Sequence, residues 1–500
     1  MTPNTTPSVD ETAPDADDER PVTPKQALPN GFQVQIDVRA TVVPGGRHIV
    51  GGSPLRVLSL SAAATEMIDP DGRILVSSPA TASLARTLLD AGVAHPRPMF
   101  GPTESDVTVV IPVRDNQIGI DRLMSALHGV RIIVVDDGSR VPVSADGAEV
   151  IRTERSAGPA AARNLGAARV LTDFVAFLDS DVTPGSDWLP RLLGHFSDEQ
   201  VAMVAPRITA MRPDGGPMAR YEALHSSLDM GRREGPVAPG TRIAYVPSAA
   251  MILRRSAFDG FDESLQVAED VDLCWRLRSD GWVIRYDPVA LAEHDHRAAL
   301  RAGLDRRRYY GTGAALLTDR HQTLASPMVM NTPMMVAMVA ALTRSRWGFG
   351  LMVAMIGFIA HRLHQRIAHI PDAPRVAARL TAQSVGFGFL QMASALCRHY
   401  WPLSILLALV SRRFRSVLLA VALAEGVVEW MRSEMLNPDA PVRLGVTRFV
   451  AIKRLDDLAY GTGLWQGAVT GRNLGALRPV IGRWGSAALP SSAAGRRPPE

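Results

Sequence analysis

The sequence predicts an α/β domain with a mostly parallel sheet at the centre of a chain of 500 residues. Between residues 106 and 300, short apolar runs alternate with helix-like patterns, which is typical of a parallel sheet covered by helices. Three runs, at 107–113, 131–135 and 174–178, indicate buried strands. The last two end in carboxylates, and ligands of open α/β sheets bind at the carboxyl ends of the strands. We therefore expect a ligand site at this edge.

Composition divides the chain into five regions. Residues 1–27 are rich in Pro, Thr and Asp, residues 485–500 in Ser, Ala, Pro and Arg, and we expect both tails to be disordered. Between them we expect a small α+β unit at 28–100, the α/β domain at 106–300 and an Arg-rich, apolar helical region at 301–484. Cys274 and Cys397 lie far apart with no C-x-x-C spacing, which argues against a disulfide framework or a zinc site and fits a reducing cytoplasm.

The N-terminal unit shows two strand patterns and two short helices. Residues 32–38 alternate apolar and polar, a turn follows at 44–46, and 48–50 can return as a second strand, which predicts a hairpin. Helices are expected over 62–67 and 82–91. The combination resembles a winged-helix unit, and residues 58–64 resemble the small peptide-binding domains of ribosomal-peptide biosynthesis. The alternative is a structural appendage without a ligand.

The helical region combines arginines with apolar stretches. Between Arg301 and Arg415 there are about fifteen arginines, no lysine and three aspartates. The apolar stretches mostly fall short of the roughly 20 residues that a membrane-spanning helix needs. We expect a bundle that packs on the α/β domain, dips into the membrane and sets its arginines on anionic head groups of the cytoplasmic face. The alternative is an ordinary helical accessory domain in the cytoplasm.

Acidic residues follow three of the predicted strands. Asp115 follows the first, Asp136 and Asp137 close the second, and Asp179-Ser180-Asp181 follows the run at 174–178. One Asp-x-Asp alone often only closes a strand, but three sites at one sheet edge indicate a binding site. Carboxylate oxygens suit Mg²⁺ or Mn²⁺, which commonly also bind substrate phosphates. No G-x-G-x-x-G follows the first strand, so a dinucleotide cofactor is disfavoured.

Two further motifs lie downstream. Glu269 and Asp270 begin a predicted helix, where acids can simply complement the helix dipole. An acid near a metal site can also accept the proton of an attacking hydroxyl, which is the reading we prefer here. His294 and His296 follow the next predicted strand, and one of them can supply a nitrogen ligand to the metal. We favour His294.

Taken in order, these motifs resemble the inverting family 2 glycosyltransferases of GT-A fold over about residues 106 to 300. The resemblance implies that Asp115 and Asp137 contact the uridine of a UDP-sugar donor and that Arg163 contacts the nucleotide. It further implies that Asp181, helped by Asp179, holds a divalent cation, Mg²⁺ or Mn²⁺, to which His294 would be the nitrogen ligand expected above. Asp270 would be the general base. The full set of expected site residues is Pro112, Asp115, Asp136, Asp137, Arg163, Asp179, Asp181, Glu269, Asp270 and His294.

The whole chain also resembles the mycofactocin-system glycosyltransferases, on residues 28–32, 51–55 and the Arg-rich C-terminal half. That resemblance implies transfer of a hexose, β-linked glucose, onto a peptide-derived redox cofactor, or repeated transfer to give an oligosaccharide. Because no Q-x-x-R-W motif follows the base, repeated transfer would be distributive. A lipid-linked or cell-envelope glycan acceptor is the alternative, and a non-catalytic binding module is another. The expected partners are the donor, the acceptor and a membrane surface, with no nucleic acid, and the expected location is the cell membrane.

Overall fold

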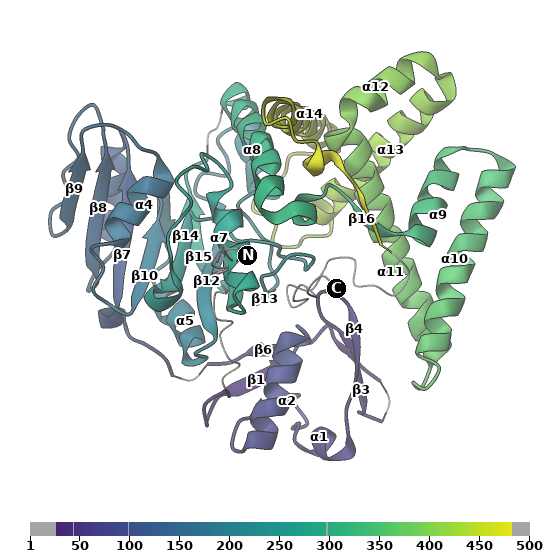
Figure 1. Ribbon diagram of the computed structural model, residues 1–500, viewed down its shortest axis with the longest axis horizontal. Helices are drawn as coiled ribbons and strands as arrows, with labels where there is room; N and C mark the ends of the chain where they lie inside the picture. Colours follow the sequence, from purple (N-terminus) through teal and green to yellow (C-terminus); the bar gives the residue numbers. More distant parts are fainter. Residues whose placement is uncertain (1–26, 44, 99, 297–298, 483–500) are drawn as a thin grey trace, which may run out of the picture.

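The computed structural model describes residues 27–43, 45–98, 100–296 and 299–482. The tails predicted at 1–27 and 485–500 lie outside these ranges, except for Ala27. The described chain forms three regions: an N-terminal α+β unit, a central α/β domain and a C-terminal bundle of helices (Figure 1).

A nine-stranded sheet is the centre of the α/β domain, in the order β11-β15-β12-β14-β10-β7-β8-β9, with β13 paired to β15. The strands β7 to β10 are parallel to one another, as predicted, and β12 is parallel to β15. β14 runs antiparallel between β10 and β12. The strands are β7 (Val107–Val113), β8 (Arg131–Asp137), β9 (Glu149–Thr153), β10 (Phe174–Leu178), β11 (Val182–Pro184), β12 (Val201–Ala210), β13 (Gly235–Pro236), β14 (Ala250–Arg254) and β15 (Val283–His294).

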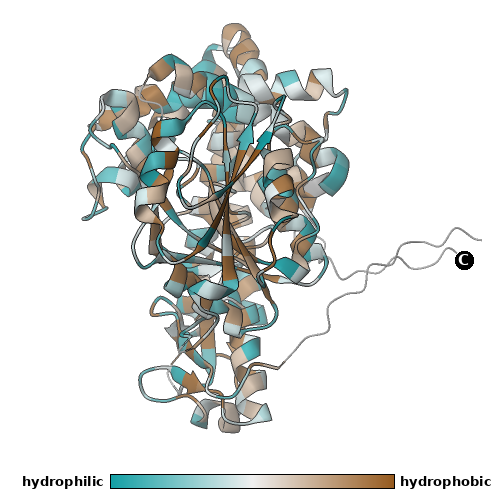
Figure 2. Cartoon of the chain, turned by 90° about the vertical axis from the view of Figure 1, so that its left-hand side faces the viewer, coloured by the Kyte–Doolittle hydropathy of each residue, from teal (hydrophilic) through white to brown (hydrophobic). Residues whose placement is uncertain are grey.

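Helices connect the parallel strands because such strands need a crossover. α3 (Gln117–Ala126) joins β7 to β8, and α4 (Pro159–Ala167) joins β9 to β10. α5 (Trp188–Gly194), α6 (Pro217–His225) and α7 (Glu269–Ser279) complete the domain. The strands β7 and β10 are buried on both faces and divide their side chains between two hydrophobic clusters, one on each side of the sheet. In Figure 2 these apolar strands run through the middle of the molecule between flanking helices.

The N-terminal unit contains two three-stranded sheets, and the predicted hairpin is wrong. β1 (Gln33–Ile36) pairs antiparallel with β5 (Arg73–Leu75) and β6 (Ala94–Pro96). β3 (His48–Gly51) pairs instead with β2 (Thr41–Val42) and β4 (Arg56–Ser59). The alternating pattern of β1 correctly indicates a half-buried strand, but its partners lie about 40 and 60 residues away, where local patterns carry no information about pairing.

The two helices of this unit form where expected, as α1 (Ala62–Glu66) and α2 (Pro79–Asp90). Ser78 caps α2: its hydroxyl accepts from the Thr81 amide, the Thr81 hydroxyl accepts from the Ser78 amide, and Pro79 occupies the first turn. The apolar face of α2 packs on β1. The resemblance to a winged helix is not confirmed.

The C-terminal region consists of helices and one pair of short parallel strands. These are α8 (Leu300–His321), α9 (Thr332–Leu342), α10 (Arg346–Arg366), α11 (Ala373–Ser394), α12 (Trp401–Val410), α13 (Arg412–Trp430), α14 (Val446–Thr470), and the strands β16 (Val329–Asn331) and β17 (Val480–Gly482). α8 leaves the α/β domain and packs along α14 (Figure 1). Within the described ranges no single helix is long and apolar enough to cross a membrane, but 373–399 and 401–410, bent by 87°, together have the length and composition.

Candidate active site

The loops after β7 and β8 are tied together at the carboxyl edge of the sheet. Asp115 adopts a left-handed φ of 54°. Its backbone N–H donates to Ser139 Oγ at 2.8 Å, and its carboxylate accepts from the Arg140 backbone N–H at 2.8 Å. That hydrogen bond, with the charge of the Arg140 side chain, lowers the pKa of Asp115. Its ionised carboxylate thus holds the two loops in register, while the preceding Pro112 lines a cavity described below.

Asp136 and Asp137, adjacent in sequence, have different surroundings. Asp136 is completely buried, accepts backbone N–H groups of Ser139 and Val143 at 2.9 and 3.2 Å, and pairs with Arg152. Burial acts to raise the pKa of Asp136, but these hydrogen bonds outweigh it and the pKa is lowered. The structure therefore places Asp136 inside the loop and off the cavity wall, whereas Asp137 lines the cavity.

Asp137 shapes the loop that enters α4. Its carboxylate accepts from Ser156 Oγ at 2.6 Å and from the backbone N–H groups of Ala157 and Gly158 at 2.8 and 3.0 Å. Gly158 has φ 97°, a conformation that favours glycine, and Pro159 then begins the helix. The Asp137 carboxylate thus holds residues 156–158, which lead into α4.

Arg163 joins two motifs, those of Asp179 and Glu269, that are 90 residues apart in sequence. Its side chain is 3% exposed; one Nη donates to Asp179 Oδ1 at 2.5 Å and the other to Glu269 Oε1 at 3.1 Å. The guanidinium also lies 5.4 Å from the Phe261 ring centroid. Sequence analysis assigned Arg163 to the nucleotide. In the structure its terminal nitrogens pair with Asp179 and Glu269, so Arg163 offsets the charge of these two acids, which form the floor of the site.

Asp181 and His294 face each other because β11 pairs with β15, which sets Val182 opposite His294. The distance from His294 Nε2 to Asp181 Oδ1 is 3.5 Å. The two rings of His294 and His296 lie 4.6 Å apart, but only His294 lines the cavity. Burial, with the charge of His294 next in effect, lowers the pKa of His296 to about 3. Of the two histidines, His294 is the one whose position suits a ligand.

The described residues contain no group of three or more His, Cys, Asp or Glu side chains arranged to hold a metal ion. Asp181 and His294 are nevertheless adjacent oxygen and nitrogen donors, a set that suits Mn²⁺ or Mg²⁺ when substrate phosphate or water completes the shell. Asp179 is already paired with Arg163 and is the weaker candidate. The residues present thus fit a cation that is shared with a substrate.

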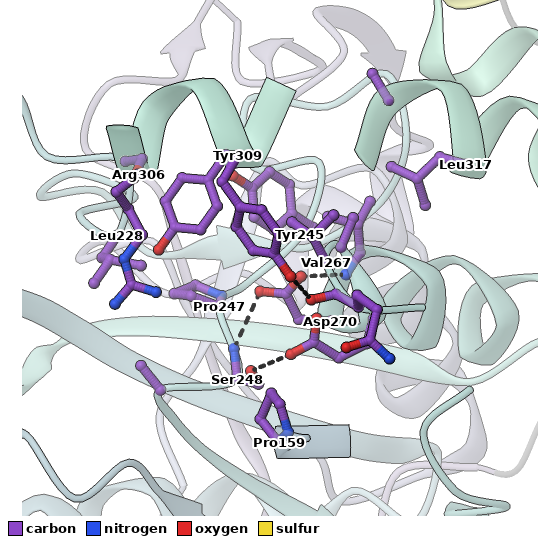
Figure 3. A pocket seen from close by; sticks show the side chains of 18 of the residues that line it. Pro159, Leu228, Tyr245, Pro247, Ser248, Val267, Asp270, Arg306, Tyr309 and Leu317 are labelled. Carbon is purple, nitrogen blue, oxygen red and sulfur yellow. Dashed lines mark hydrogen bonds between the residues drawn. The ribbon is translucent and has the colours of Figure 1, made fainter. Parts of the chain in front are cut away.

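Asp270 lies in the first turn of α7, after Ala268, whose φ of 68° is unusual for a residue with a side chain. Its two carboxylate oxygens accept from the backbone N–H groups of Ser248 at 3.3 Å and Val271 at 2.8 Å (Figure 3). Burial, reinforced by the neighbouring charge of Glu269, raises the pKa of Asp270 to about 7. Asp270 is therefore a carboxylate that can take up a proton near neutral pH.

One cavity of about 1000 Å³ connects these groups, within the range of nucleotide-sized sites. Its wall includes Pro112, Asp137, Arg163, Asp179, Asp181, Glu269, Asp270 and His294. The opposite wall comes from the C-terminal helices and includes Arg306, Tyr309, Tyr310, Arg398, His399 and Tyr460. Sequence analysis did not anticipate this second wall. The run of three arginines and two tyrosines at 306–310 is the signal that could have identified its largest part.

Comparison with known proteins agrees with this geometry. The family model for glycosyl transferase family 2 matches residues 108–261, which include the strands β7, β8 and β10. The pre-mycofactocin glycosyltransferase of Mycobacterium tuberculosis is 48% identical over 468 residues, covering 91% of this chain and 98% of the relative. The O-antigen chain rhamnosyltransferase of Salmonella typhimurium is 26% identical over 197 residues, covering 37% of this chain and 62% of the relative.

Solved structures match less closely. A mannosyltransferase from Pyrobaculum calidifontis in complex with GDP-Man and Mn²⁺ covers 66% of this chain and 89% of its own at 15% identity, with a TM-score of 0.35. S. aureus TarS in complex with UDP covers 42% and 65% at 17% identity, with a TM-score of 0.31. The family assignment therefore rests on the sequence matches. The chain belongs to the family 2 glycosyltransferases, with a GT-A-like central domain, and within that family it is close to the glycosyltransferases of the mycofactocin system.

Proposed function

We propose that the protein transfers a hexose, β-linked glucose, from a UDP-sugar to a mycofactocin-type, peptide-derived redox cofactor, with inversion at the anomeric carbon. The observation that carries the proposal is one cavity that holds a carboxylate of raised pKa, Asp270, together with the Asp181–His294 pair. The identity to a pre-mycofactocin glycosyltransferase over nearly the whole chain supports the acceptor. Repeated transfer to give an oligosaccharide is part of the proposal.

In the proposed reaction, Asp270 accepts the proton of the acceptor hydroxyl. The acceptor oxygen forms its bond to the anomeric carbon while the bond from that carbon to the diphosphate oxygen breaks. Because attack and departure occur on opposite faces of the sugar, the configuration inverts. The pKa of Asp270, about 7, suits a general base, since catalytic groups work best when their pKa lies near the working pH.

The donor would lie along the carboxyl edge of β7 and β8. Pro112 and the loop at 156–158, which Asp137 shapes, form the wall available to the base and ribose. Asp181 and His294, with Asp179 beside them, would hold the cation. When bound, a divalent cation supplies positive charge to the leaving diphosphate.

Replacing Asp181 tests the cation site. We expect Asp181→Asn to weaken Mn²⁺-dependent UDP binding and transfer by at least about 100-fold, because the remaining His294 and substrate oxygens hold a cation poorly. Isothermal titration with UDP, with Mn²⁺ and with EDTA, measures the effect. Asp187→Asn is the matched control, since Asp187 is 55% exposed and forms only a surface pair with Arg191. UDP affinity in Asp181→Asn that stays within twofold of the original would contradict the assignment.

The acceptor can be tested separately from the donor. A lipid-linked or cell-envelope glycan is the second candidate acceptor, favoured by the apolar helices of the C-terminal region. Incubating the protein and UDP-glucose with either the peptide-derived acceptor or a lipid-linked acceptor, followed by mass spectrometry, distinguishes the two. We expect the added hexose on the peptide-derived acceptor.

We also propose that the protein binds the cytoplasmic face of the cell membrane through an apolar face made by α10, α12 and α13. In α12 only Ser404 and Ala408 are buried, and the leucines and isoleucine around them face solvent, the reverse of a helix in a water-soluble bundle. The large exposed residues of this face are Trp347, Phe349, Leu351, Val353, Leu403, Ile405, Leu406, Leu407, Leu409, Val410, Leu419 and Leu423.

The apolar face is carried by two helical hairpins, α9–α10 and α12–α13, which contact each other. The side chain of Arg344, between α9 and α10, donates to Ser416 Oγ on α13 at 2.7 Å. Exposed arginines border the apolar residues at 344, 346, 412, 413 and 415, and no acid occurs between 401 and 424. A helix as short as α12 measures about 15 Å, about half the hydrocarbon thickness. The bordering arginines suit anionic head groups, and the short length of α12 suits insertion into one leaflet of the membrane.

Vesicle flotation tests this binding. The full chain should float with vesicles that contain anionic phosphatidylglycerol, less with pure phosphatidylcholine, and Leu406→Glu/Leu409→Glu should reduce flotation at least about tenfold. Leu171→Glu is the control, since Leu171 is 76% exposed on the central domain. If the protein does not float with either vesicle, or if it forms a dimer that the double variant dissociates, the face binds something other than lipid.

A further inference from the structure

The start of α8 carries two adjacent arginines with different surroundings. Arg307 is 5% exposed; its Nε lies 2.6 Å from Asp456 Oδ1 on α14, and an Nη donates to both oxygens of Glu222 on α6 at 3.1 Å. Three helices thus meet at this one guanidinium, which fixes the position of α8 against the α/β domain. Removing one partner from a buried pair of this kind leaves an uncompensated charge, so the helix is firmly held here.

Arg306 is on the cavity side of the same turn (Figure 3). Its guanidinium lies 5.6 Å from the centroid of the Tyr310 ring, one turn further along the helix. The cavity that Arg306 lines also contains Asp179, Asp181 and Tyr310 in its wall. Arg306 therefore lines the same cavity as Asp181.

Arg306 differs from the other arginines of the cavity wall because, among the described residues, its guanidinium has neither a carboxylate within ion-pair distance nor a hydrogen-bond acceptor. The others have partners: Arg163 with Asp179 and Glu269, Arg307 with Asp456 and Glu222, Arg398 with Asp456 and Asp457, and Arg114 with the Ser156 hydroxyl. Arg306 alone among them brings a guanidinium to the cavity that is not already paired.

An unpaired positive charge in this cavity would offset the negative charges of the wall acids and of a bound donor diphosphate. Asp179, Asp181, Glu269 and Asp270 lie along this part of the wall, and Arg163 offsets two of these acids. A donor diphosphate brings further negative charge into a partly desolvated site, where repulsion between like charges is stronger than in water. A planar guanidinium matches phosphate oxygens in geometry as well as charge.

We propose that Arg306 binds the diphosphate of the nucleotide-sugar donor and stabilises it as it leaves. When the bond between the anomeric carbon and the diphosphate oxygen breaks, the electron pair of that bond stays on the oxygen, and Arg306 donates hydrogen bonds to the group that gains this charge. The C-terminal helices thereby contribute a catalytic residue to a site whose recognised family motifs all come from the α/β domain. The inference rests on the proposed donor class, but it concerns the diphosphate and not the base or the sugar.

Nucleotide binding by variants of Arg306 tests the inference. Titrating the full chain with the diphosphates and monophosphates of uridine, guanosine and thymidine, in Mn²⁺, identifies the base that binds. For that base, Arg306→Gln should weaken diphosphate binding at least about tenfold and monophosphate binding less than threefold, and Arg306→Lys should restore part of the loss. Arg301→Gln is the matched control on the same helix, 96% exposed and 4.0 Å from Asp305.

The outcomes separate this inference from the proposed function. Preference for guanosine diphosphate would overturn the UDP-sugar donor and still test Arg306 on the nucleotide that binds. If Arg306→Gln loses affinity equally for the diphosphate and the monophosphate, Arg306 only supports the cavity wall. If its affinity for both is unchanged, Arg306 makes no contact with the nucleotide. Binding of no nucleoside diphosphate by the original protein would overturn both proposals.

Discussion

Asp270→Asn should abolish sugar transfer while leaving the donor site intact. The asparagine keeps the shape of the side chain, but its one oxygen can accept from either Ser248 or Val271, not from both, and it cannot take the proton of the acceptor. General-base catalysis contributes about 10²–10⁴-fold, so we expect kcat to fall by roughly 10³-fold with UDP affinity unchanged within twofold. Asp280→Asn, at the far end of the same helix, should retain full activity. Transfer by Asp270→Asn at more than a tenth of the original rate would exclude Asp270 as the base.

The same residue predicts opposite effects of pH on activity and stability. The pKa of Asp270 is about 7 in the folded protein and about 3.9 in an unfolded chain. Activity needs the ionised form and should therefore rise with pH up to about 8. Folding favours the protonated form, so the contribution of this group to stability is fully present below about pH 4 and is lost as pH rises to 7. Asp270→Asn should thus melt at a higher temperature than the original protein at pH 8, with a smaller difference at pH 5.

Arg163→Leu should cause the largest loss of stability in the site. It leaves Asp179 and Glu269 without their shared partner, next to Asp270, in a region where Arg163 and Glu269 side chains are 3% and 11% exposed. Breaking a buried ion pair by removing one partner costs about 3–5 kcal/mol, and we expect a loss of about 3 kcal/mol because Asp179 is 29% exposed. The midpoint of urea unfolding measures this loss of stability.

A surface pair provides the comparison for Arg163. Arg191 and Asp187 form an i,i+4 pair whose side chains are 46% and 55% exposed, so Arg191→Leu should change stability by less than about 0.5 kcal/mol. Arg163→Lys should be intermediate, because a lysine keeps the charge but not the fork that reaches both acids. If Arg163→Leu is as stable as Arg191→Leu, the guanidinium does not neutralise the acids of the floor.

The sequence was most informative where local pattern and chemistry coincide. The strands β7, β8 and β10 contain continuous apolar runs, and acids close or follow each of them. Both the parallel sheet and the convergence of Pro112, Asp137, Asp179 and Asp181 on one cavity could therefore be predicted. Glu269 and Asp270 were placed at a helix start for the same kind of reason. The partners of these side chains could not be predicted, since Arg163 reaches Glu269 across more than a hundred residues.

The failures have physical causes. A half-buried strand such as β1 shows its period but not its neighbours, which led to the wrong hairpin. Asp136 and Asp137 are the same residue type at adjacent positions, so the sequence alone does not separate their roles. Because side chains alternate along a strand, Asp136 points into the loop and Asp137 toward the cavity. Arg306 was overlooked because it is one of about fifteen arginines, and only the pairing of its neighbours singles it out.

The product of the reaction is the most direct test of the central claim, that Asp270 activates an acceptor hydroxyl opposite the leaving nucleotide. The protein would be incubated with UDP-glucose, Mn²⁺ and the peptide-derived acceptor, and the anomeric configuration of the purified product determined by NMR. We expect a β-linked hexose, made by the original protein and not by Asp270→Asn. An α-linked product, or an equal yield from the variant, would contradict the central claim.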